Sequence, residues 1–477
     1  MSVDFAALGM TIDGRSHPGG GTFPVVNPAT GEEFATAPDC TRGQLDDAMA
    51  AAAAAFPAWS GDEVARRESM RRSADAIEAE ATQIARIHTM EQGKPLRESL
   101  GNVMGTAAGF RAYADMDIPR QVVQDDEQAR IEVVRRPLGV VAVLRPWNGL
   151  LGDPTPAAIR AGNTLVYKPS PSTPLASLAL GQVLARALPP GVFNVVSGRD
   201  PLGNWVVEHP VPRGIAFTGS SQTGSRVNAA AAPDLKRVIL ELGGNDAAIV
   251  LDDVDPDELA QRLFWTAFGL SGQMCLATKR VFLPNSIFER TADALAKIAA
   301  SVRVGDGLDP DTEMGPLTTE AQFDRVSELV ADALAQGASA LAGGKPMDRK
   351  GYFYEPTVLV GVEDGVRIVA EEQFGPVLPL LSYRTVEEAV ERANGTQYGL
   401  GGSVWSSDPA LASAVAERLQ SGTAWINTHA RSGHQAPFGG AKRSGLGRQH
   451  GMWGIDSLTD LQTVWHSRAG VTTYPAA

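Results

Sequence analysis

The stretch GVVAVLRPWNGLLGDPTPAAIRAGNTLVYKP, at residues 139–169, contains a complete strand–helix–strand unit. Residues 140–144 form a short apolar run typical of a buried strand, 156–161 are compatible with a helix, and 164–167 form a second apolar run. Strands that are buried on both faces read as continuous apolar runs, and a crossover helix joins parallel neighbours. The stretch therefore predicts a mostly parallel sheet that is covered by helices.

The alternation of strands and helices continues toward the C-terminus. Strands are predicted at 192–196, 215–217, 238–240 and 281–283, and helices at 175–187, 202–208, 223–231, 259–270 and 288–302. Apolar residues between 323 and 333 keep a spacing of three to four and stop before Gly337, which predicts another helix. Sheets of this kind bind ligands at the carboxyl ends of their strands.

The sequence before residue 139 contains a predicted helix and a predicted excursion. The alanine run at 50–55 indicates the helix, Thr41 with Gln44 resembles a capping box at its start, and Pro57 is expected to mark its end. Residues 120–136 are polar and partly alternating, which predicts two strands that leave the main fold.

The composition excludes several classes of partner. The chain has 477 residues, enough for two or three domains, and its net charge of −13 argues against nucleic acid or a membrane surface as partner. No run of 18 apolar residues and no signal peptide are visible. Two cysteines, Cys40 and Cys275, fit a reducing compartment, so we expect a cytoplasmic protein. The seven histidines show no metal-ligand spacing, so no metal is expected.

Three residues with useful chemistry stand at the ends of predicted elements. Cys275 follows Gly and Gln behind a helix, a place compatible with a nucleophilic thiol on a tight exposed turn, although an inert buried thiol is the commoner case for a lone cysteine. Glu241 ends an apolar strand, where burial would raise its pKa toward that of a general base; a solvated strand end is the alternative. Asn148 follows the strand at 140–144, where its amide suits an oxyanion; an ordinary Asn-Gly turn is the alternative.

Two further features point to a phosphate-bearing ligand. Gly219 and Ser220 lie in a turn between a strand and a helix, where free N–H groups favour a pyrophosphate, although the G-x-G-x-x-G spacing is absent. Lys168 ends a strand on the same predicted edge and has the reach for a ribose or a phosphate. A solvated surface charge is the alternative for this lysine.

Together these segments resemble the aldehyde dehydrogenase superfamily over roughly residues 10–467. The shared blocks are spread in order along the chain, which makes chance agreement negligible. They are NPATG (27–31), PWN (146–148), GNT (162–164), KPS (168–170), FTGS (217–220), ELGG (241–244), GQMC (272–275), MGPL (314–317), EQFGPV (372–377), PFGG (437–440) and SG (444–445).

The resemblance implies an α/β fold with two doubly wound αβα domains, mostly parallel sheets and a small β oligomerisation hairpin. An NAD(P)-binding domain is expected at 1–119 and 138–241, and a catalytic domain at 242–446. An oligomerisation arm is expected at 120–137 and 447–477. Because family members are commonly dimers or tetramers, the resemblance also implies a homodimer or a homotetramer.

The resemblance further implies the oxidation of a small-molecule aldehyde to a carboxylic acid with NAD or NADP. Cys275 is expected to attack the aldehyde and carry a thioester, Asn148 to hold the oxyanion, and Glu241 to activate the water that releases the acid. The residues expected to bind the dinucleotide are Trp147, Lys168, Ser170, Gly219, Ser220, Leu242, Gly243, Glu372 and Phe374.

The chain departs from the family pattern at three places. Pro171 stands where NAD-preferring members often carry a glutamate that repels a 2′-phosphate, so the preference between NAD and NADP stays open. The segment 149–161 is shorter than usual, which leaves the shape of the substrate tunnel open. Gln449 replaces a glutamate that is thought to assist proton movement, a change expected to slow deacylation.

Two alternative functions are kept beside this one. A relative that passes the acyl group to coenzyme A would often lack a glutamate at position 241. A catalytically inactive paralogue, such as the lens crystallins derived from this family, would bind the dinucleotide without turnover. The sequence does not identify the aldehyde.

Overall fold

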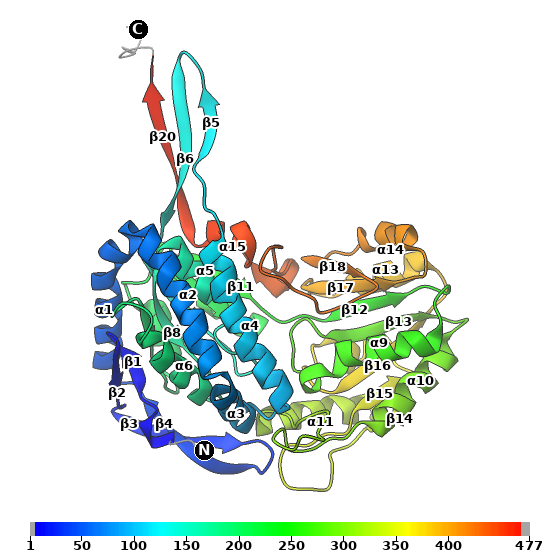
Figure 1. The fold of residues 1–477 in the computed structure, drawn as a ribbon. Coiled ribbons are helices and arrows are strands. Elements are labelled where there is room, and N and C mark those ends of the chain that lie inside the picture. The colour runs from blue at the N-terminus through cyan, green and yellow to red at the C-terminus, as the bar shows by residue number, and fades with distance from the viewer. Residues whose placement is uncertain (1–4, 469–477) are drawn as a thin grey trace.

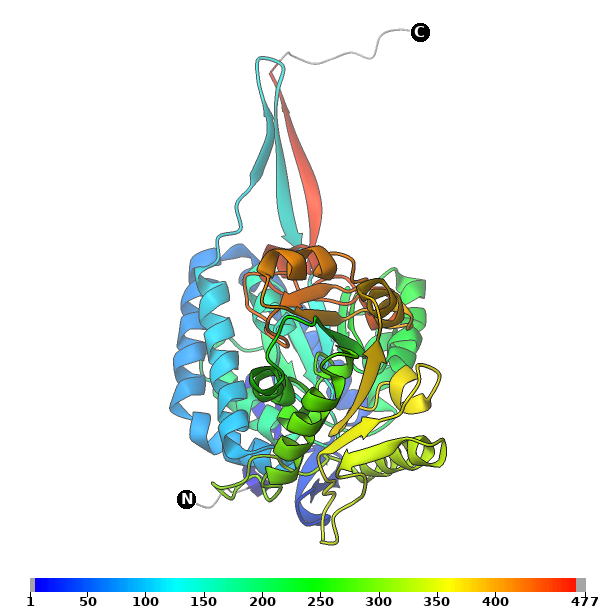
Figure 2. The ribbon, with the colours of Figure 1, turned by 90° about the vertical axis from the view of Figure 1, so that its right-hand side faces the viewer.

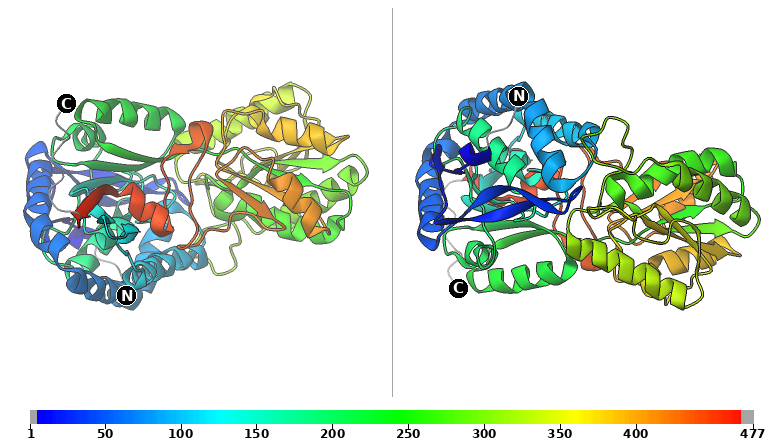
Figure 3. Two further views of the ribbon diagram at one scale, coloured as in Figure 1. Left: turned by 90° about the horizontal axis from the view of Figure 1, so that it is seen from above. Right: turned by 90° about the horizontal axis from the view of Figure 1, so that it is seen from below.

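A computed structural model describes residues 5–468, and its two large sheets lie in separate lobes (Figure 1, Figure 3). The sheet of the first lobe is built from β1 (Met10–Ile12), β2 (Arg15–His17), β7 (Val140–Leu144), β8 (Thr164–Lys168), β9 (Phe193–Val195), β10 (Gly214–Thr218), β11 (Arg237–Glu241) and β19 (Gly445–Leu446). Its strand order is β19-β11-β10-β7-β8-β9-β1-β2. The central strands β11, β10, β7, β8 and β9 run parallel, and the antiparallel strands lie at the edges.

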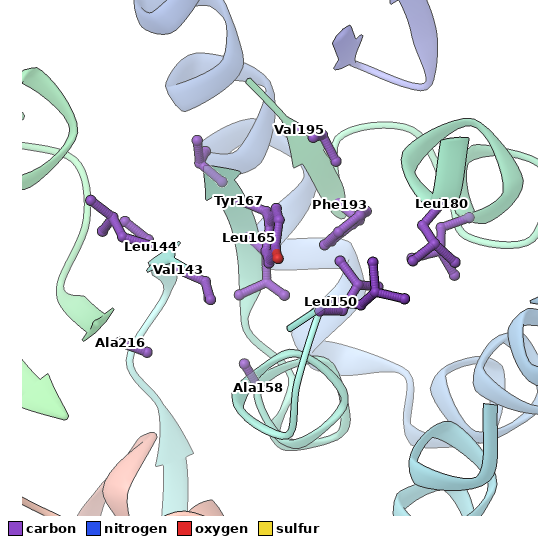
Figure 4. Packing of buried hydrophobic residues seen from close by; sticks show 14 of the residues in the cluster. Val143, Leu144, Leu150, Ala158, Leu165, Tyr167, Leu180, Phe193, Val195 and Ala216 are labelled. Atoms are coloured by element: carbon purple, nitrogen blue, oxygen red, sulfur yellow. The ribbon is translucent and has the colours of Figure 1, made fainter. Parts of the chain in front are cut away.

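Helices cover both faces of this sheet. They are α1 (Arg42–Gly61), α2 (Glu63–Ala79), α3 (Ala81–Gln92), α4 (Leu96–Asp115), α5 (Pro154–Ala161), α6 (Leu175–Ala185), α7 (Leu202–Glu208) and α8 (Ser221–Ala231). The chain passes from β7 through β8 to β9 and then returns to β10, so right-handed crossovers place α5 and α6 on one face and α7 and α8 on the other. Figure 4 shows the core between β8, β9, α5 and α6, where Leu165, Phe193, Ala158 and Leu180 are buried together.

The second lobe has a seven-stranded sheet in the order β14-β15-β16-β13-β12-β17-β18, in which only β14 is antiparallel to its neighbour. The strands are β12 (Asp246–Val250), β13 (Thr278–Pro284), β14 (Ser339–Ala342), β15 (Thr357–Val360), β16 (Val377–Tyr383), β17 (Gly401–Trp405) and β18 (Thr423–Ile426). The helices are α9 (Pro256–Phe268), α10 (Phe288–Ser301), α11 (Glu320–Ala335), α12 (Arg367–Ala370), α13 (Val386–Asn394) and α14 (Pro409–Ala416).

Alternate residues of β12 show how this second sheet is buried on both sides. Ala247 and Ile249 belong to one buried cluster, whereas Ala248 and Val250 belong to another. Successive side chains of a strand point to opposite faces, so the two clusters fill the two sides of the sheet. This arrangement confirms the predicted α/β class with two doubly wound, mostly parallel sheets.

A three-stranded antiparallel arm projects away from the body (Figure 1, Figure 2). It consists of β5 (Gln121–Asp125), β6 (Ala129–Pro137) and the C-terminal β20 (Thr459–Ser467), which follows α15 (Gly451–Ser457). The two strands expected at 120–136 are confirmed. A separate hairpin pairs β3 (Gly21–Asn27) with β4 (Glu32–Asp39). Within residues 5–468, no helix is both long enough and apolar enough to cross a membrane.

The predicted elements are confirmed with small shifts of their ends, and one prediction is wrong. The capping box of Thr41 and Gln44 is present, but α1 continues through Pro57 to Gly61. Trp59, in the turn after the proline, is buried in the core, and this packing holds the last turn of the helix in place. Many elements were not predicted, among them helices α2–α4, α13 and α14 and strands β1–β4, β12 and β14–β18.

Candidate active site

The candidate residues of the first lobe follow the carboxyl ends of parallel strands. Asn148 comes after β7, Lys168 ends β8, Ser220 comes after β10, and Glu241 ends β11. Because these strands are neighbours in one parallel sheet, the residues gather along one edge of it, which is where such sheets bind ligands.

Cys275 lies in the loop between α9 and β13 of the second lobe. The loop begins at a 3-10 helix, η3 (Gly269–Gly272), in which Leu270 and Ser271 have positive φ values of 55° and 56°. Two non-glycine residues in the left-handed region persist only where their surroundings hold them. The buried Lys279 provides such a constraint, since its ammonium donates to the Gly272 carbonyl oxygen over 2.7 Å.

Asn148 reaches this loop from the other lobe. Its side-chain Nδ2 donates to the backbone oxygen of Gln273, two residues before Cys275, over 2.9 Å. An amide nitrogen carries two hydrogens, so one remains for a ligand oxygen. Gly244, three residues after Glu241, touches the same loop: a Cβ at this glycine would lie 2.3 Å from the Cys275 carbonyl oxygen. Only a glycine permits so close an approach.

Glu241 is a buried carboxyl group without a hydrogen-bond partner. It is 3% exposed, and neither of its oxygens is bonded to any group within residues 5–468. Burial raises its pKa to about 8, although Arg145 and Arg448 act in the opposite direction. A carboxyl group with a pKa close to neutral pH has the protonation behaviour of a general base.

The thiol of Cys275 is strongly influenced by nearby acidic groups. Burial raises its pKa to about 12, with further contributions from Glu241, Glu372 and Asp246, and Lys279 acts in the opposite direction. Glu241 makes the largest of these charge contributions. The thiol is therefore neutral at pH 7 in the protein alone, and a base or an added positive charge is required to form the thiolate.

The predicted residues Glu372, Phe374 and Trp147 lie where the two lobes meet. Glu372 Oε1 accepts the Gly244 N–H over 3.2 Å, and burial raises the pKa of this carboxyl group to about 7. The rings of Trp147 and Phe374 pack edge to face with centroids 5.4 Å apart. The ammonium of Lys279 lies 5.1 Å from the centre of the Phe374 ring, a cation–π contact.

The chain around Leu242 and Gly243 is held by a distant segment. The Leu242 N–H donates to the Ser444 carbonyl oxygen over 2.9 Å, and the Ser444 hydroxyl donates to the Gly243 carbonyl oxygen over 2.6 Å. The Gly219 N–H donates to the Glu241 carbonyl oxygen over 3.0 Å. These bonds link the end of β11 to both of its neighbours and fix the position of Glu241.

Lys168, Ser170 and Ser220 form an edge that fits a dinucleotide. Among residues 5–468 the buried Lys168 ammonium donates only to the Pro169 carbonyl oxygen, over 3.2 Å, and burial lowers its pKa to about 8. Ser170 is also buried, and Ser220 caps α8 by accepting the Thr223 N–H. A buried ammonium with spare donors suits a ribose hydroxyl, and a helix N-terminus suits a pyrophosphate.

Sequence reasoning missed two charged residues that contact the site. Arg145 donates to the Thr218 hydroxyl over 2.7 Å and acts on the pKa of Glu241. Its place directly after a buried strand is the signal that also singled out Glu241. Lys94 donates to the Asn148 carbonyl oxygen over 3.1 Å, a contact that no local pattern indicates. Gln449 is buried, and its Nε2 has no partner within the described residues.

Comparisons with known proteins show the family of this chain. A model described as the aldehyde dehydrogenase family matches residues 16–464. A betaine aldehyde dehydrogenase of Cereibacter sphaeroides is 37% identical over 465 residues, which cover 95% of this chain and 96% of that protein. A succinate-semialdehyde dehydrogenase [NADP(+)] of Escherichia coli is 36% identical, with 93% and 94% covered. The solved NAD+ complex of an aldehyde dehydrogenase from Bacillus cereus is 35% identical, with a TM-score of 0.93 and 97% and 98% covered.

Proposed function

Since the chain belongs to the aldehyde dehydrogenase family and oxidises an aldehyde to a carboxylic acid, we propose that the reaction passes through a thioester on Cys275. Asn148 holds the oxyanion, and Glu241 is the base that deacylates the enzyme. The observation that carries this proposal is the convergence on one loop: the Asn148 amide bonds Gln273, and Glu241 acts on the Cys275 thiol.

The first step is the attack of the Cys275 sulfur on the aldehyde carbon. The thiol must first release its proton to the solvent, because the thiolate is the form that attacks. The carbonyl oxygen becomes negative and takes the second Nδ2 hydrogen of Asn148 together with the Cys275 N–H. Such a donor typically lowers the barrier by about 2.7–4 kcal/mol.

A bound dinucleotide would supply the acceptor for the hydride that leaves the former aldehyde carbon, so that the adduct on Cys275 becomes a thioester. We propose that Lys168, Ser170 and Glu372 hold its ribose hydroxyls, and that Gly219, Ser220 and Trp147 lie at its pyrophosphate. Leu242, Gly243 and Phe374 would pack by the nicotinamide ribose. Pro171 puts no charge against a 2′-phosphate, so we propose that both NAD and NADP are used.

Release of the acid requires a base that can act on water. Glu241 is buried, acts on the pKa of the Cys275 thiol and has the raised pKa that this task needs. It takes a proton from water while the hydroxide attacks the thioester, and the Cys275 sulfur leaves with the returned proton. The presence of this glutamate favours hydrolysis over transfer to coenzyme A.

The substrate is tested with a panel of aldehydes of different charge. The relatives are named for a cationic aldehyde and for an anionic one, so the panel contains betaine aldehyde, succinate semialdehyde, hexanal and benzaldehyde. NAD(P)H formation is followed at 340 nm with each cofactor, for wild type and for Cys275→Ala. We expect turnover without coenzyme A that is lost in the variant. Undiminished activity of Cys275→Ala, or a requirement for coenzyme A, would overturn the proposal.

We also propose that the arm joins copies of this chain into a homodimer or a homotetramer. Two large apolar side chains of β20, Leu461 and Trp465, stand four residues apart on one face of the strand and are 64% and 65% exposed, which suits a surface that a second copy covers. In the same scheme residues 1–119 and 138–241 bind the dinucleotide, 242–446 carry the catalytic cysteine, and the protein works in the cytoplasm.

A further inference from the structure

Lys94 is a buried lysine that the reaction described above does not use. It lies in the turn between α3 and α4, and it is 1% exposed. Its ammonium donates to Asn102 Oδ1 over 2.7 Å and to the backbone oxygen of Asn148 over 3.1 Å. Burying an ammonium is unfavourable unless hydrogen bonds compensate for the lost water, so these two contacts determine where the charge lies.

The contact with Asn148 belongs to a closed ring of hydrogen bonds. The Lys94 N–H donates to Gln92 Oε1 over 3.0 Å, and the Thr318 hydroxyl donates to the Gln92 carbonyl oxygen over 2.9 Å. The Thr318 N–H donates to Gln273 Oε1 over 2.9 Å. Asn148 Nδ2 closes the ring at the Gln273 carbonyl oxygen over 2.9 Å. The ring therefore includes segments of both lobes and ends two residues from Cys275.

The main chain at Lys94 is fixed by close packing against the second lobe. Gly93 has a φ of 96°, a conformation that favours glycine. A Cβ at Gly307 would lie 2.2 Å from the Lys94 carbonyl oxygen, and a Cβ at Gly315 would lie 2.1 Å from the Gly93 carbonyl oxygen. The main chain from which the Lys94 side chain extends to Asn148 is therefore held in one position.

We propose that Lys94 is a positioning residue whose ammonium, acting through this ring, holds Asn148 in the place where it can donate to the substrate oxygen. The inference rests on the proposed function, because it needs Asn148 as the oxyanion donor. One Nδ2 hydrogen is already bound to Gln273, so the direction of the other depends on where the Asn148 main chain is held. A displacement of about 1 Å at a reacting centre costs up to about 100-fold in rate.

The test compares two buried lysines whose ammonium groups each donate to two oxygens. Lys94→Met removes the ammonium that donates to the Asn148 carbonyl oxygen. Lys236→Met is the matched control, since the Lys236 ammonium is also buried and donates to two backbone oxygens, of Val207 and His209, over 2.6 and 2.7 Å. With the panel aldehyde that wild type oxidises fastest, Lys94→Met should lower kcat about 10- to 100-fold and change KM less than about twofold. Lys236→Met should leave both constants close to wild type.

Thr318→Val opens the ring on its other side without touching Lys94 or Asn148, and it serves if Lys94→Met does not fold. It should lower kcat about three- to tenfold with little change in KM. In an Asn148→Ala background neither change should reduce kcat further, because the donor they position is gone.

The outcomes separate this inference from the proposed function. If Asn148→Ala keeps the kcat of wild type, the proposed function fails and the inference fails with it. If Asn148→Ala is impaired while Lys94→Met and Thr318→Val behave like Lys236→Met, only the inference fails. The inference would also be overturned if Lys94→Met and Thr318→Val lowered kcat in the Asn148→Ala background by the same factors as in wild type. A purely structural role of Lys94 predicts that result.

Discussion

Glu241→Gln should make the protein more stable at alkaline pH while it removes turnover. The native carboxyl group has a pKa of about 8 because it is buried, compared with 4.5 for an ordinary glutamate. Above pH 4.5 the unfolded chain releases this proton whereas the folded chain retains it, so wild type loses stability as the pH rises from 4.5 to 8. The shift corresponds to about 5 kcal/mol, which is fully lost above pH 8. Glutamine has the same shape and has no proton to lose.

The measurement is the difference in Tm between Glu241→Gln and wild type, from pH 5 to pH 8.5. We expect the difference to grow in favour of the variant across this range, by roughly 8–15 °C if the transition follows a single lobe. Glu289→Gln, at an exposed position of α10, is the control and should show no such trend. A difference that stays constant with pH would refute the reasoning, because it would mean that Glu241 is ionised in the folded protein throughout this range.

Three further predictions concern the donor, the cofactor and the arm. Asn148→Ala should lower kcat about 100- to 1000-fold with little change in KM, since an oxyanion donor is lost; steady-state kinetics with an unchanged kcat would contradict this role. Pro171→Glu should weaken NADP use at least about tenfold more than NAD use, because the new carboxylate repels the 2′-phosphate. Equal effects in kcat/KM for the two cofactors would refute that interpretation. The double change of Leu461 and Trp465 to serine should lower the mass measured by light scattering, and an unchanged mass would exclude the arm as the contact.

The part of the fold that the sequence predicts best is the parallel sheet around β7. Strands such as β7 and β8 are buried on both faces and therefore stand out as continuous apolar runs. Helices α2 and α4 escaped prediction because they are rich in alanine, glycine and charged residues and pack mainly against other helices. The end of α1 was misplaced because a local rule for proline was overridden by the tertiary packing of Trp59.

The candidate site was likewise predicted only in part from the sequence. Cys275, Glu241 and Asn148 were reached through motifs that resemble a known family, and each lies at the end of an element that the sequence indicates. Lys94 was missed because its partner Asn148 lies 54 positions away in the chain. The bond between Thr318 and Gln92 spans 226 positions, so no pattern in either segment reports it.

The central claim is that Cys275 carries the acyl group, and the chain offers a direct test because it has only one other cysteine, Cys40. Glu241→Gln is mixed with an oxidisable aldehyde and NAD(P)+, quenched in acid, and its peptides are analysed by mass spectrometry. The account predicts the mass of the acyl group on the peptide that contains Cys275 and none on the peptide that contains Cys40. NAD(P)H formation with an unmodified Cys275, or an acyl group on Cys40 instead, would contradict it.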